Sequence, residues 1–167
     1  MDDFLVALEN TTVGQFIHTS SSLLGFPAVL TMHTFGLCFI VGANVIVSMR
    51  LLGVAPGIPL QPLRRLFPFM WLGLVLTILS GFALAIAAAT TRLLNPILIF
   101  KLVVIAVASP LMFRMQKKIF NKALDSDDST VPPGAREMAA GQLILWLVVV
   151  VAGRLIAYSA TILGEGY

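Results

Sequence analysis

Three basic side chains lie inside otherwise apolar stretches of this chain: His33, Lys101 and Arg154. A titratable or charged group is costly to bury in hydrocarbon, so inside a membrane segment it marks a functional site or an inter-helix contact. An imidazole can ligate a metal or a haem iron, and lysine and arginine bind carboxylates and phosphates. We therefore predict that these three residues share one pocket for an anionic or haem-like ligand.

The composition indicates the environment in which such a pocket would form. The chain has 167 residues, of which 58% are hydrophobic and 11% are charged, and its mean hydropathy is +0.96. Soluble domains carry roughly a quarter charged residues, so this composition predicts a membrane protein. The net charge of +3 is small, which argues against a nucleic-acid partner. A single cysteine, Cys38, excludes an internal disulfide and CxxC-type motifs.

Apolar periodicity predicts an all-α membrane protein, a four-transmembrane-helix up-down bundle with an N-terminal interfacial amphipathic helix. Residues 1–25 hold that helix, expected over about 3–20, and a serine-rich link. The acidic start of the chain lacks the basic residues of a signal peptide, so we expect no cleaved segment. Residues 26–167 form the bundle, in which apolar runs predict spans at about 27–49, 68–89, 96–115 and 139–162.

Charge asymmetry predicts the orientation of the bundle in the membrane. The loops after the first and third spans contain most basic residues, namely Arg50, Arg64, Arg65, Arg114, Lys117, Lys118, Lys122 and Arg136. The positive-inside rule therefore puts both termini outside the cytoplasm. At 1.5 Å per residue, His33 then lies about 9 Å from the outer end of its span, Lys101 about 8 Å and Arg154 about 10–12 Å. Three helices would therefore place basic groups at a similar depth below the outer surface of the membrane.

The first hypothesis is a b-type haem near the periplasmic side, serving electron transfer with a quinone or a periplasmic cytochrome. Haem needs an axial imidazole, and its propionates favour lysine or arginine partners. The expected roles are iron ligation by His33 and, from the interfacial helix, His18; propionate binding by Lys101, Arg154 and Tyr158; and close approach of the macrocycle at Gly36.

Other hypotheses stay open. The chain could be a non-catalytic accessory or structural subunit of a larger membrane complex, or a self-assembling homo-oligomer. It could instead bind a quinone, a lipid headgroup or another anionic small molecule. Copper could use Met32, His33, Cys38 and Met49, but Cys38 lies about 140° around the helix from His33. No enzyme motif is present, and all eight acidic residues lie outside the spans, so we expect no enzyme.

Each candidate residue also has a purely structural interpretation. His33 could be a packing histidine that is satisfied by a neighbouring helix. Lys101 lies close enough to the membrane surface for its ammonium group to reach water. His18 could simply be a solvent-exposed residue of the interfacial helix. Tyr158 could be an aromatic residue of the membrane interface. Arg154 is the hardest to explain in this way, because its side chain would have to stretch about 10 Å.

The chain resembles a family of uncharacterised small four-span bacterial inner-membrane proteins, known as a domain of unknown function. The resemblance is carried by ALENT, FPAVLTMHTFGLCFIVGANVIVSMRLLGV, LRRLFPFMWLGLVLTILSGF, NPILIFKL and GRLIAY, which spread over nearly the whole chain. It implies four spans with a histidine, a lysine and an arginine at positions 33, 101 and 154, and no established activity. Many relatives carry a histidine where this chain has Phe113 and Arg114.

Overall fold

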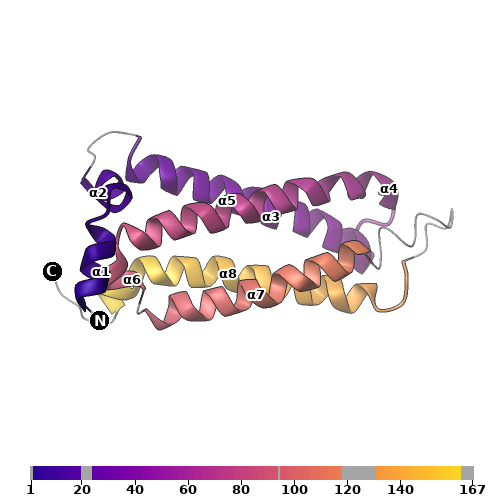
Figure 1. Cartoon of the computed structure of the whole chain (residues 1–167). Coiled ribbons are helices and arrows are strands. Elements are labelled where there is room, and N and C mark those ends of the chain that lie inside the picture. Colours follow the sequence, from indigo (N-terminus) through magenta and orange to yellow (C-terminus); the bar gives the residue numbers. More distant parts are fainter. Residues whose placement is uncertain (1, 20–23, 94, 118–130, 163–167) are drawn as a thin grey trace.

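The computed structural model describes residues 2–19, 24–93, 95–117 and 131–162, without the side chains of residues 2, 18, 19, 157 and 159–162. Within these ranges the chain forms helices and no strands (Figure 1): α1 (Asp2–Glu9), α2 (Thr12–Thr19), α3 (Phe26–Leu52), α4 (Leu60–Leu63), η1 (Arg64–Leu66), α5 (Phe67–Ile86), α6 (Ala89–Arg92), α7 (Pro96–Met115) and α8 (Ala135–Ile162).

Among the described residues, four helical segments are long and apolar enough to cross a membrane: Phe26–Leu52, Leu60–Ile86, Pro96–Met115 and Ala135–Ile156. The protein therefore has the helices that an integral, multi-pass membrane protein requires. Helix α8 begins before the expected span, after Gly134, whose φ of 83° is readily adopted by glycine. Most of the expected polar loop before it, like the serine-rich link at 20–22, lies outside the described residues.

The expected single interfacial helix is divided into α1 and α2. Thr11 separates them: its hydroxyl donates to the Leu8 carbonyl oxygen at 2.7 Å and accepts from the Gly14 amide at 3.3 Å. Thr11 thus acts as the N-cap of α2 and favours a new helix start over continuation of α1. Leu5 of α1 and Ile17 of α2 are buried. Figure 1 shows both helices at the end of the bundle where α6 also lies.

Helices α3 and α5 meet backbone to backbone at two glycines. A Cβ atom at position 36 would lie 2.5 Å from Thr77 Oγ1, and one at position 73 would lie 2.6 Å from the Gly36 carbonyl oxygen and 2.7 Å from the Ile40 amide nitrogen. Because residue numbers rise along α3 as they fall along α5, the two helices run antiparallel. Small residues permit such close packing in a membrane, where helices gain little from hydrophobic burial.

Local sequence signals set the ends of the long helices. Helix α3 stops at Gly53, which takes a left-handed conformation with φ 87° and directs its amide to the Arg50 and Met49 carbonyl oxygens. The loop that follows is closed by Arg50, whose buried Nε donates to the Ile58 carbonyl oxygen. Helix α7 starts with Pro96, directly after Asn95, whose side chain caps the helix by accepting from the Ile97 amide at 2.9 Å.

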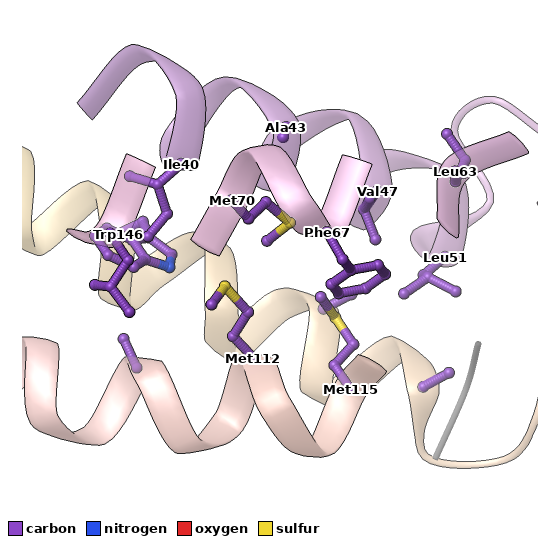
Figure 2. Packing of buried hydrophobic residues seen from close by; sticks show 14 of the residues in the cluster. Ile40, Ala43, Val47, Leu51, Leu63, Phe67, Met70, Met112, Met115 and Trp146 are labelled. Carbon is purple, nitrogen blue, oxygen red and sulfur yellow. The ribbon is translucent and has the colours of Figure 1, made fainter. Parts of the chain in front are cut away.

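The buried apolar core fills the bundle away from α1, α2 and α6. Figure 2 shows Phe67 and Met70 of α5 facing Met112 and Met115 of α7, and Trp146 of α8 beside Ile40 of α3. Trp71 of α5 donates from Nε1 to Gln116 Oε1 at 2.9 Å.

Replacing Gly73 by alanine should destabilise the protein by about 1–3 kcal/mol, the usual cost of overpacking. The added methyl group would press on backbone atoms of α3, which cannot move aside as a flexible side chain can. Thermal unfolding of the detergent-solubilised protein measures this effect. Gly42→Ala is the control, because a Cβ atom there meets nothing within 4 Å. Equal stability of the two variants would contradict the close contact between α3 and α5.

Candidate functional site

A pocket of about 230 Å³, lined by apolar side chains together with three basic ones, lies at the end of the bundle near α6. Every long helix contributes to its wall, so the pocket exists only when the bundle is assembled. Its lining residues are Phe26, Leu30 and His33 of α3; Gly81, Leu84 and Ala85 of α5; Arg92 of α6; Leu98 and Lys101 of α7; and Gly153 and Ile156 of α8.

His33 is held in the pocket wall by Ser80 of α5. The distance from its Nδ1 to Ser80 Oγ is 2.9 Å. Ser80 is fully buried and donates its hydroxyl hydrogen to the Leu76 carbonyl oxygen at 2.5 Å. Because a hydroxyl has one hydrogen to donate, Ser80 Oγ must accept from Nδ1–H of His33. In the neutral ring, Nε2 is then the unprotonated nitrogen, able to accept a hydrogen bond or bind a metal.

Lys101 enters the same pocket from α7. Only 8% of its surface is exposed, although lysine is among the residues that are almost never fully buried without a partner. Gly153 of α8 makes room for it, since a Cβ atom there would lie 3.3 Å from Lys101 Nζ. Gly81 does the same for His33, whose Cε1 lies 3.2 Å from the position of an added Cβ. Two glycines thus line the walls beside the two polar groups.

The described ionisable side chains that line the pocket are all basic. Arg92 reaches it from α6, so two side chains that are positively charged in water and one imidazole line it. None of the described lining residues is an aspartate or a glutamate. Lys101 and His33 line the same pocket from different helices. Such an arrangement favours an anion, which would offset the repulsion between like charges.

The structure brings His33 and Lys101, two of the three predicted basic residues, into one pocket. Arg154 is exposed and does not line the pocket, and its neighbour Gly153 occupies that position instead. Tyr158 is 56% exposed and is likewise not a lining residue. His18 belongs to α2, but its side chain lies outside the described part of the chain.

Two observations bear on the haem hypothesis. Gly36 does not offer an open face to a macrocycle, because α5 covers it through Thr77 and Gly73. The pocket volume of about 230 Å³ is below the roughly 300–1,000 Å³ of typical cofactor sites. The described residues around His33 therefore do not fit haem. Across the described chain, no three His, Cys, Asp or Glu side chains gather into a metal-binding group.

Arg92 is the charged residue that the sequence did not assign to the site. In the sequence it lies in the short link between the second and third predicted spans. The signal that could have drawn attention to it is its position nine residues before Lys101, at the same expected end of the bundle. Ser80 gave no signal of its own, because a serine in an apolar helix often bonds only to its own backbone.

Comparisons of the chain with protein-family models, with curated proteins and with solved structures give no match. The resemblance to a four-span family and the bacterial origin thus stay predictions.

In a His18→Asn variant, in which His33 is the only remaining histidine, the neutral ring should carry its proton on Nδ1. Nitrogen-15 NMR of the imidazole distinguishes the two tautomers. Ser80→Ala should shift the equilibrium toward the Nε2–H form, because it removes the acceptor of the Nδ1 hydrogen bond. Ser109→Ala is the control, since Ser109 Oγ donates to the Ile105 carbonyl oxygen within α7. A predominant Nε2–H tautomer in the parent would contradict this arrangement.

Proposed function

We propose that this membrane protein binds the negatively charged head of a small molecule or lipid in the pocket formed by His33, Lys101 and Arg92. The single observation that carries the proposal is the burial of Lys101 in that pocket, where no described lining residue is acidic. A buried ammonium needs a compensating anion or must give up its proton. A bound carboxylate or phosphate would supply the compensation.

The donors of the pocket suit such a ligand. Lysine acts as a point charge, whereas arginine can bind two oxygens of a carboxylate or phosphate with its planar fork. The unprotonated Nε2 of His33 can accept a hydrogen bond from a hydroxyl or a protonated acid oxygen. The ligand can therefore carry both an anionic and a hydrogen-donating oxygen, as phosphate monoesters and glycerol-bearing headgroups do.

The size and walls of the pocket restrict the ligand further. A volume of about 230 Å³ accommodates a headgroup more readily than a complete amphiphile. The remaining lining side chains are mainly apolar, including Phe26, Leu30 and Ile156. These side chains suit the first carbons of an aliphatic or isoprenoid tail. We infer an anionic amphiphile, a lipid or a quinone-like molecule, or a free anion of the same head chemistry.

Lys101→Met should lower the affinity for an anionic headgroup by roughly ten- to a hundredfold. A hydrogen bond to a charged group contributes about 1.5–3 kcal/mol, and about 1.4 kcal/mol corresponds to a factor of ten. Native mass spectrometry with added phosphatidylglycerol measures lipid binding, and phosphatidylcholine provides the zwitterionic comparison. Calorimetric titration with inorganic phosphate tests whether a free anion suffices.

Lys117→Met is the matched control, because Lys117 is exposed beyond the opposite end of α7 and carries the same charge. An equal loss in both variants would assign binding to general surface charge and contradict the proposal. Failure of both phosphatidylglycerol and phosphate to bind the wild-type protein would also contradict it. A Soret band in the purified protein that His33→Ala abolishes would favour the haem hypothesis instead. Stoichiometric co-purifying chains would favour an accessory-subunit role.

A further inference from the structure

Helix α6 carries Arg92 into the pocket although its own sequence starts a helix poorly. It is four residues long, and its N-cap residue is Ala88, which has no side-chain oxygen to accept from the first free amides. A single helical turn is unstable on its own, because ordering it gains few hydrogen bonds. Something outside α6 must therefore hold this turn in place.

Glu9, the last residue of α1, supplies the missing cap. Its Oε1 accepts from the Thr90 amide at 2.9 Å and from the Thr90 hydroxyl at 2.7 Å. Thr90 is the second residue of α6, and Arg92 follows two residues later. Helix α1 packs against α6, and buried Leu5 anchors α1 in the structure. A carboxylate from the interfacial helix thus performs the capping role that Ala88 cannot.

We propose that Glu9 is a positioning residue for ligand binding, which it supports by capping α6 and so holding Arg92 in the pocket. This inference rests on the proposed function, because it assumes that Arg92 contacts an anionic ligand. It makes α1 part of the binding apparatus, so that the interfacial helix and the pocket are coupled through Thr90. Any displacement of α1 from the bundle would then release Arg92 and weaken binding.

Glu9→Ala should lower the affinity for phosphatidylglycerol by roughly three- to thirtyfold, the range that corresponds to loss of a helix cap. A decrease in affinity would distinguish loss of the cap from a purely electrostatic effect of the carboxylate. Removal of a negative charge near a cationic pocket should by electrostatics alone strengthen anion binding. Glu9→Gln keeps an oxygen acceptor without the charge, so it should retain most of the affinity. Asp3→Ala is the control, because it removes an exposed acidic side chain from the same helix.

A double-mutant cycle with Arg92 separates positioning from a merely structural role. If Glu9 acts through Arg92, Glu9→Ala should have little further effect on affinity in an Arg92→Gln background. Hydrogen exchange of the Thr90 amide gives a readout that needs no ligand, and it should be faster in Glu9→Ala than in Asp3→Ala.

The possible failures are distinguishable. Unchanged affinity in Glu9→Ala, in a protein that binds phosphatidylglycerol through Lys101, would overturn the positioning role and leave the proposed function intact. An equal loss with and without Arg92, or unchanged exchange at Thr90, would also overturn it. Absence of binding to the wild-type protein would instead overturn the proposed function, and the positioning role with it.

Discussion

The contact between Gly36 and Gly73 is the constraint on which the pocket geometry depends. It brings the backbones of α3 and α5 together so closely that neither position has space for a methyl group. His33 lies one turn before Gly36, and Ser80 lies one turn after Thr77, the residue that faces Gly36. With the two helices pinned at the glycines, His33 Nδ1 falls within hydrogen-bond distance of Ser80 Oγ. The orientation of the imidazole is thus a consequence of helix packing.

The second pair of long helices supplies the charge. Lys101 of α7 extends toward Gly153 of α8, and α8 also packs against α3, so the lysine shares a pocket with His33. The N-terminal helix α1 helps to place the third basic group, because Glu9 of α1 caps α6 and α6 carries Arg92. The site is therefore assembled from three separate packing events, each of which depends on a small residue or on a single carboxylate.

Several polar groups remain deep in the bundle beyond the pocket. Asn44, Thr77, Gln142 and Trp146 are almost wholly buried, and each has one polar side-chain atom without a hydrogen-bond partner among the described residues. Asn44 accepts from Ser48 within its own helix, and Gln142 donates to the Ala108 carbonyl oxygen of α7. Unpaired polar atoms are costly in hydrocarbon.

The amino-acid sequence by itself determined that the chain forms helices and that four of its segments are long and apolar enough to span a membrane. These properties follow from apolar run length and from the rise per residue, which hold in any packing arrangement. Only the tertiary structure decided which way each helix face turns. In lipid, a helix that is apolar on all sides has little hydrophobic preference for its orientation. Arg154 could therefore turn outward while Lys101 turned inward, and α5 could cover Gly36. Arg92 lies in the pocket because Glu9 caps the turn that carries it, through Thr90, which is 81 residues from Glu9 along the chain.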